Sequence, residues 1–217
     1  MRGFAASRDE GGADAGDRGS RRTRQPARRT AGTGGKATGL RSYGEMTRDE
    51  PLIFEADLPA PEHFDSFHPF IKGVFSQWHP TPFQIDGLTV VTAEQWMMFS
   101  KARLFGDDGA ANAILATDSP DEQKRLGQNV QGFRQEAWDR WKVSFVYQGN
   151  LAKFSQNAGA ARQLRATGDA MLVEANPRDW IWGVGLAIDD PSVHSPAEWK
   201  GGNLLGRILT KVRSALG

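Results

Sequence analysis

Apolar side chains in the second half of the chain recur every three or four residues, which is the spacing of one face of a helix. One such stripe follows Gly132 and contains Trp138, Trp141, Phe145, Gly149, Ala152 and Gln156. Another closes the chain and contains Leu204, Leu205, Ile208, Leu209, Val212 and Leu216. These patterns predict a long helix and an amphipathic last helix, for which Asn203 stands at the N-cap position.

Helix-start signals predict two more helices between residues 92 and 130. Thr92 can cap a helix that runs to about Phe105, and Gln95 occupies the capping-box position three residues on. Residues 119–122 read Ser-Pro-Asp-Glu, which combines a capping serine, a first-turn proline and a reciprocal acid. Gly168 is suited to ending a helix before the short apolar run AMLVEA.

The β signals are short and lie near the start of the patterned region. Asp86-Gly87 between two apolar runs predicts a hairpin, and residues 52–60 (LIFEADLPA) predict a short strand before a proline-rich turn. The sequence therefore predicts one compact, mainly α domain over residues 52–217, of α+β type, with a small β-hairpin.

Residues 1–45 differ from the rest in composition. They contain ten basic and five acidic residues of the chain's 27 and 26, so residues 46–217 carry a net charge of −4. Residues 1–45 also contain few large apolar side chains. Burying them cannot offset the conformational entropy that the segment would lose on folding, which predicts a disordered Arg/Gly-rich tail. A nonspecific nucleic-acid arm and a translation start at Met46 are the alternative interpretations.

Composition excludes several classes of chemistry. The chain has no cysteine, which rules out disulfides, thiolate nucleophiles and cysteine-based zinc sites. Its four histidines lack metal-site spacing, so neither a metal nor another cofactor is predicted. Without a membrane-length apolar run or a secretory signal, we expect a cytoplasmic protein with no membrane partner.

Two groups of acidic residues are candidates for chemistry. Glu94 shares a helix face with Met97, Met98 and Lys101. Its carboxylate could be a general acid or base at a pocket wall. The alternative is an ordinary first-turn acid that interacts with the helix dipole. Residues 173–185 (VEANPRDWIWGVG) set two acids, Glu174 and Asp179, beside Trp180, Trp182, Gly183 and Gly185. This segment is either a ligand-binding loop or a buried turn with solvated carboxylates.

Phosphate-binding signals are weaker. Lys142 and Lys153 lie three helical turns apart beside the tryptophan stripe, and Gly201, Gly202 and Asn203 precede the last helix with free backbone N–H groups. Solvated lysines and a plain helix start explain the same residues. Neither common nucleotide-binding glycine motif is present.

Six ordered stretches together resemble the NADAR family, also called YbiA-like: FSQWHPTPF, TAEQWMMFSKARLFGD, LGQNVQGFRQEAWDRWK, GNLAKFSQN, TGDAMLVEANPRDWIWGVG and GGNLLGRILTKVR. The resemblance covers about residues 71–216. It implies a mainly helical domain with a small β element that binds NAD- or ADP-ribose-like ligands and acts as an N-glycosidase. The family's substrates are phosphoribosylamino-pyrimidine intermediates of riboflavin synthesis or ADP-ribosylated guanine bases.

The resemblance also implies site residues. The family's helix acid corresponds to Glu94, the acid and tryptophan of its W-G-x-G loop to Asp179 and Trp182, and its Asn-Leu-Leu-Gly to residues 203–206. This chain departs from the common pattern with Gln77-Trp78 in place of Asn-Phe, and with Gln95 in place of a histidine.

An N-glycosidase passes through an oxocarbenium-like state, which a carboxylate stabilises while a second acid protonates the leaving nitrogen. We therefore expect Glu94 and Asp179 to be the catalytic pair, with the acid and base roles open. The residues expected to bind substrate are Phe75, Ser76, Lys101, Trp138, Lys142, Lys153, Glu174, Trp182, Gly183 and Asn203. The expected partner is a small ribosyl phosphate or an ADP-ribosylated nucleobase, with nucleic acid reached through the basic tail. A non-catalytic sensor of NAD or ADP-ribose is the alternative function.

Overall fold

The computed structural model describes residues 50–217, so the prediction for the tail of residues 1–45 lies outside the described residues. The α-helices of this part are α2 (Ala93–Leu104), α3 (Asp108–Leu115), α4 (Pro120–Gln128), α5 (Gln135–Gln156), α6 (Ala158–Arg165) and α7 (Leu204–Ala215). The strands are β1 (Phe67–Phe70), β2 (Phe83–Ile85), β3 (Leu88–Val90) and β4 (Met171–Glu174). The predicted class, mainly helical with a small β component, is confirmed.

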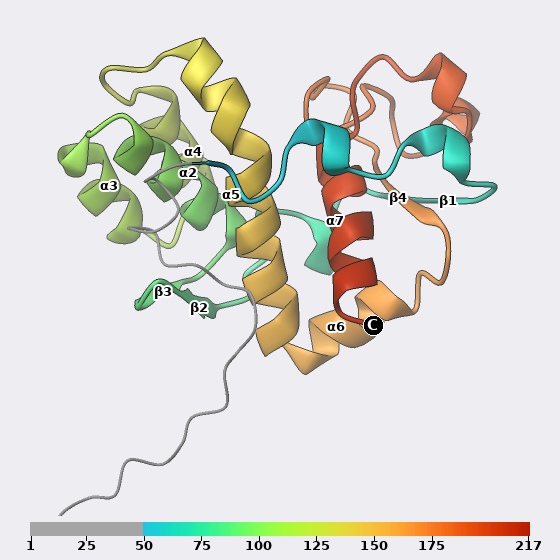
Figure 1. The fold of residues 1–217 in the computed structure, drawn as a ribbon, viewed down its shortest axis with the longest axis horizontal. Coiled ribbons are helices and arrows are strands. Elements are labelled where there is room, and N and C mark those ends of the chain that lie inside the picture. The colour runs from blue at the N-terminus through green and yellow to red at the C-terminus, as the bar shows by residue number, and fades with distance from the viewer. Residues whose placement is uncertain (1–49) are drawn as a thin grey trace, which may run out of the picture. The chain divides into compact units, whose positions relative to one another are not determined.

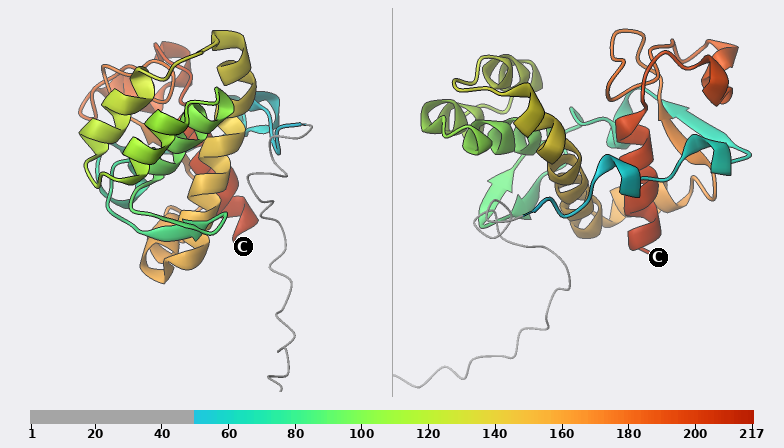
Figure 2. Two further views of the ribbon diagram at one scale, coloured as in Figure 1. Left: turned by 90° about the vertical axis from the view of Figure 1, so that its left-hand side faces the viewer. Right: turned by 45° about the horizontal axis from the view of Figure 1, so that its top comes forward.

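Helix α5 runs through the middle of the domain and packs against a different group of elements on each side (Figure 1). On one side it contacts α2, which packs on α3 and α4, and on the other it contacts α7, which lies on β4. Figure 2 (left) looks onto the α2–α4 group. Residues 143–150 of α5 are all buried, as is typical of a helix surrounded by protein.

The predicted starts of α2 and α4 are confirmed. Thr92 Oγ1 accepts a hydrogen bond from the Gln95 N–H at 3.0 Å, and Ser119 caps α4 in the same way, with proline in its first turn. The Gln95 side chain, however, accepts from the Val91 N–H and donates to the Ile114 carbonyl at the end of α3. Gln95 therefore ties α2 to α3 from a buried position.

The strands form two separate pairs. The predicted hairpin is confirmed, since β2 and β3 pair antiparallel around Asp86 and Gly87, both of which have positive φ. The other pair was not predicted: β1 and β4 run parallel, with Phe67 opposite Met171 and Phe70 opposite Glu174.

The prediction of a short strand within residues 52–60 is wrong. Residues 55–57 form a single 3-10 turn, η1 (Glu55–Asp57), because the Asp57 carboxylate accepts the Phe54 N–H at 2.8 Å. The Leu52 N–H is satisfied by Ser144 Oγ of α5. Because side chains of Asp57 and Ser144 satisfy these backbone groups, the segment does not join a sheet. Within residues 50–217, no helix combines the length and apolar composition needed to cross a membrane.

Candidate active site

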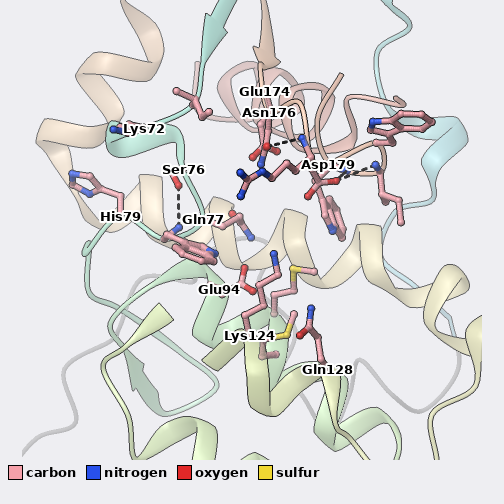
Figure 3. A pocket seen from close by; sticks show the side chains of 18 of the residues that line it. Lys72, Ser76, Gln77, His79, Glu94, Lys124, Gln128, Glu174, Asn176 and Asp179 are labelled. Atoms are coloured by element: carbon pink, nitrogen blue, oxygen red, sulfur yellow. Dashed lines mark hydrogen bonds between the residues drawn. The ribbon is translucent and has the colours of Figure 1, made fainter. Parts of the chain in front are cut away.

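A pocket of about 1090 Å³ lies between the α2–α4 side of the domain and the loop that follows β4. Its lining comes from segments far apart in the sequence: residues 71–79, helices α2 and α4, Trp138 of α5, and residues 174–182. Figure 3 shows Glu94 and Lys124 on one wall, with Glu174, Asn176 and Asp179 on the wall opposite. Of the residues predicted to form the site, the pocket brings together Ser76, Glu94, Lys101, Trp138, Glu174, Asp179 and Trp182.

Glu94 is held in the first turn of α2 with only 6% of its surface exposed. Its N–H donates to the Gln77 carbonyl at 3.0 Å, which fixes the helix start against the loop of residues 76–79. Burial raises the pKa of the Glu94 carboxyl to about 7; the charge of Asp179 adds to this rise, while Lys124 and a hydrogen bond from the Trp78 side chain oppose it. A carboxyl with this pKa can give or take a proton near neutral pH.

Glu174 extends from the last position of β4 into the same pocket. Its Oε2 atom is buried and has no hydrogen-bond partner within residues 50–217. Burial, followed by the nearby charges of Asp179 and Glu94, raises the pKa of Glu174 to about 8. The carboxyl is therefore mainly protonated at neutral pH.

Asp179 has a different environment although it shares the pocket. Its Oδ1 accepts hydrogen bonds from the N–H groups of Ile181 at 3.0 Å and Trp182 at 2.8 Å (Figure 3). These bonds fold the loop after β4 into a turn that brings Trp182 to the pocket wall. Asp179 thus fixes the loop and adds negative charge near Glu94 and Glu174.

Tryptophan and methionine side chains provide the apolar part of the lining. Trp78, Trp138, Trp180 and Trp182 come from three segments of the chain, and Met97 and Met98 of α2 line the same pocket. Trp180 is 61% exposed at the mouth. Flat aromatic faces with this distribution are suited to stacking on a nucleobase or a ribose.

Four cationic side chains line the pocket: Lys72, Lys101, Lys124 and Arg178. The Lys101 ammonium lies 4.4 Å from the centroid of the Phe133 ring and 5.6 Å from that of Trp138. Burial lowers the pKa of Lys101, and the Glu94 charge opposes that shift. Within residues 50–217, histidine and acidic side chains form no group of three or more arranged to hold a metal ion.

Three residues predicted to bind substrate lie outside the pocket lining because other contacts occupy them. Phe75 stacks on Phe154 in the core, with 6.4 Å between ring centroids. Lys153 is fully buried, and its Nζ donates to the Ser76 carbonyl at 3.0 Å. Lys142 pairs with Asp139 one helical turn earlier. Lys153 thus supports the pocket from behind by holding the loop that carries Ser76.

Gly183 and Asn203 also lie outside the lining and instead shape the loop behind it. A Cβ on Gly183 would lie 2.8 Å from the Glu174 carbonyl, so only glycine fits there. Asn203 is the N-cap residue of α7, as predicted, but its side chain makes no capping hydrogen bond to the helix. Its amide is directed at β4 instead: Oδ1 accepts the Glu174 N–H and Nδ2 donates to the Leu172 carbonyl, both at 3.0 Å. A fully buried Asn203 is placed to anchor the strand that carries Glu174.

Gln77, Lys124 and Arg178 line the pocket but were not among the predicted site residues. Gln77 and Arg178 lie inside stretches that resemble the family, next to residues that were chosen. Lys124 lies outside those stretches, and a lysine on a polar helix face is usually solvent-exposed, so the sequence does not mark it as a site residue. Gln77 stands out in the structure, since its buried Nε2 has no hydrogen-bond partner within residues 50–217.

Comparisons with known proteins agree with this fold. An N-glycosidase of Acanthamoeba polyphaga mimivirus is 40% identical over a match that covers 64% of this chain and 85% of that protein. A chloroplastic riboflavin biosynthesis protein of Zea mays is 29% identical over 67% of this chain and 24% of its own length. The NMR structure of the E. coli protein YbiA superposes with a TM-score of 0.58 at 28% identity, covering 70% of this chain and 86% of YbiA. Residues 64–217 match the NADAR domain, and the chain therefore belongs to the NADAR family.

Proposed function

We propose that this protein is an N-glycosidase that hydrolyses the bond between a ribose carbon and a nucleobase nitrogen. The observation that carries the proposal is the pair Glu94 and Glu174, two buried carboxyls with pKa values of about 7 and about 8 in one tryptophan-walled pocket. The enzyme class agrees with the name of the mimivirus relative, an N-glycosidase.

The proposed reaction needs one group to help the base leave and another to stabilise the ribose cation or to activate water. We assign the second role to Glu94, whose ionised form stabilises positive charge at the ribose C1 atom and accepts a proton from the attacking water. Its pKa of about 7 leaves a substantial ionised fraction at neutral pH. Trp138 and Trp182 would enclose the ribose and exclude bulk water.

An ADP-ribosylated nucleobase is the substrate that fits the pocket best. A volume of about 1090 Å³ lies just above the ~300–1,000 Å³ range of small-molecule sites, so the pocket has room for a large ligand. Lys72, Lys101, Lys124 and Arg178 supply more positive charge than one phosphate requires, which favours a diphosphate. The four tryptophans of the lining, from three segments of the chain, provide stacking surfaces for two bases, the adenine and the departing base.

A phosphoribosylamino-pyrimidine is the second candidate substrate. The observation that favours it is the match to a riboflavin biosynthesis protein, although the matched region is 24% of that protein. Such a molecule also presents a ribose–nitrogen bond and a phosphate, but it would leave part of the pocket unfilled.

The test is to incubate the purified protein with each of the two compounds and to measure the released base by chromatography. We expect a higher kcat/KM with the ADP-ribosylated base than with the pyrimidine intermediate. A higher kcat/KM with the pyrimidine intermediate would identify this smaller compound as the preferred substrate. Tight binding of either compound with no product over hours would contradict the proposed N-glycosidase activity and support the interpretation as a non-catalytic sensor.

A further inference from the structure

We infer that Glu174, and not Asp179, is the catalytic residue that donates a proton to the departing base. This inference rests on the proposed function and assigns the partner of Glu94 within the same site. It replaces the sequence-based pairing of Glu94 with Asp179.

The hydrogen bonds of Asp179 give its carboxylate a fixed, structural role. Its Oδ1 accepts from two backbone N–H groups, those of Ile181 and Trp182. An oxygen that holds two backbone N–H groups of its own loop is not free to turn toward a departing base. If Asp179 moved to protonate a base, the turn that carries Trp182 would lose both bonds.

Glu174 is held in the opposite way, with a fixed backbone and a free carboxyl. Its N–H donates to Asn203 at 3.0 Å, and its carbonyl accepts from Val184 at 2.9 Å. The side chain therefore extends into the pocket from a rigid point at the end of β4. Its buried Oε2 lacks a partner within the described part of the chain, so a bound base would supply the missing hydrogen bond.

The charges around Glu174 favour its protonated form. Asp179 from the following loop and Glu94 from α2 both disfavour ionisation, while Lys124 from α4 opposes them. Arg178 lines the same pocket. Because burial is the largest cause of the raised pKa, the protonated form persists to about pH 8, above the pKa of Glu94. This order agrees with the geometry, in which Glu174 lines the pocket with an oxygen that has no partner among the described residues, so of the pair Glu174 is the acid and Glu94 the base.

The step balances with water as the only co-reactant. The bond between ribose C1 and the base nitrogen breaks, and its electron pair stays with the nitrogen, which receives the Glu174 proton either directly or through the conjugated ring. Water adds its oxygen to C1 and loses a proton to Glu94. Proton exchange with solvent then returns Glu94 to its ionised form and Glu174 to its protonated form.

Comparing two leaving groups tests this assignment. One substrate carries a neutral purine or pyrimidine, which needs a proton to leave, and the other is an ADP-ribosyl pyridinium, whose base departs uncharged without one. We expect Glu174→Gln to lower kcat on the neutral base by about 10²–10⁴-fold, the usual contribution of general acid catalysis. On the pyridinium substrate kcat should change little. A similar loss on both substrates would overturn the inference.

The pH profile supplies a second readout. On the neutral base, the kcat/KM of the parent enzyme should fall below about pH 7 as Glu94 gains a proton and above about pH 8 as Glu174 loses one. The alkaline fall should be absent in Glu174→Gln and absent in the parent enzyme with the pyridinium substrate, so the parent alone decides the matter if the variant fails to fold.

Asp179→Asn is the matched control, because the asparagine oxygen can still accept the two N–H bonds. It should keep the alkaline fall, although the lost charge shifts it to lower pH. If Asp179→Asn abolishes that fall and Glu174→Gln keeps it, Asp179 is the acid and the inference is wrong. If the parent enzyme releases base from neither substrate, the proposed function itself is overturned.

Discussion

At the level of single residues, Gln77 has a buried side-chain donor at the pocket wall. Asn150 Nδ2 donates to Gln77 Oε1 and to the Val146 carbonyl, each at 2.8 Å, which fixes the orientation of both amides. Gln77 Nε2 is then left without a partner among the described residues, at the wall of the pocket. Because a buried donor without a partner is costly, we expect a carbonyl or hydroxyl of the substrate to accept its hydrogen bond.

Removing this donor should weaken substrate binding more than chemistry. Gln77→Met keeps the side-chain length and removes both the Nε2 donor and the Oε1 atom that accepts from Asn150. The bond lost to the substrate is worth about 0.5–1.5 kcal/mol, so we predict a KM roughly two- to tenfold higher with a nearly constant kcat. Steady-state kinetics measures both. Gln128→Met, at an exposed position of the same pocket, is the control and should leave KM unchanged. An unaltered KM in Gln77→Met would show that Gln77 does not contact the substrate.

At the level of elements, the site depends on the close approach of α2 and α5. Trp96 of α2 lies against Gly149 of α5, and its indole N–H donates to the Phe145 carbonyl at 3.0 Å. A Cβ on Gly149 would overlap the Trp96 ring. Since α2 carries Glu94 and α5 carries Trp138, this glycine sets the distance between two walls of the pocket.

Gly149→Ala should therefore destabilise the protein by about 1–3 kcal/mol, the usual cost of overpacking a core. Chemical denaturation measures the change. Gly159→Ala is the matched control, because this helical glycine of α6 has only the Arg162 guanidinium nearby, at 3.8 Å, and alanine has the higher helix propensity. The control should be unchanged or more stable by up to about 1 kcal/mol. Equal effects of the two substitutions would contradict this account of the α2–α5 contact.

Elements with local signals could be predicted from the sequence, and those with distant partners could not. Thr92 and Ser119 mark helix starts within four residues, and Asp86-Gly87 marks its own hairpin. The pairing of β1 with β4 joins residues about a hundred positions apart, and short apolar runs do not specify their partners.

Only part of the candidate site could be predicted from the sequence, because the surroundings of each side chain depend on distant segments. Family resemblance selected Glu94, Asp179 and Trp182, which the pocket does bring together. It could not separate the environments of Asp179 and Glu174, because burial and hydrogen bonding arise only in the fold. The position of Lys153 beside the tryptophan stripe suggests phosphate binding, with a solvated lysine as the alternative, whereas in the structure its side chain is fully buried behind the pocket.

For the domain as a whole, the pocket lies where its two sides meet. Glu94 comes from the α2–α4 side, and Glu174 comes from β4, which α7 and β1 hold on the other side. Helix α5 packs against both sides and keeps them together. Each side thus contributes one carboxyl, and the proposed chemistry requires both.

The most direct test of this account is the effect of Glu94→Gln on binding and on base release, measured on the same ADP-ribosylated nucleobase by calorimetry and by chromatography. The variant keeps the shape of the side chain and removes its charge, so we predict binding close to that of the parent protein and a loss of base release of at least about 10²-fold. Base release at the parental rate would contradict the central claim that this carboxylate carries out the cleavage.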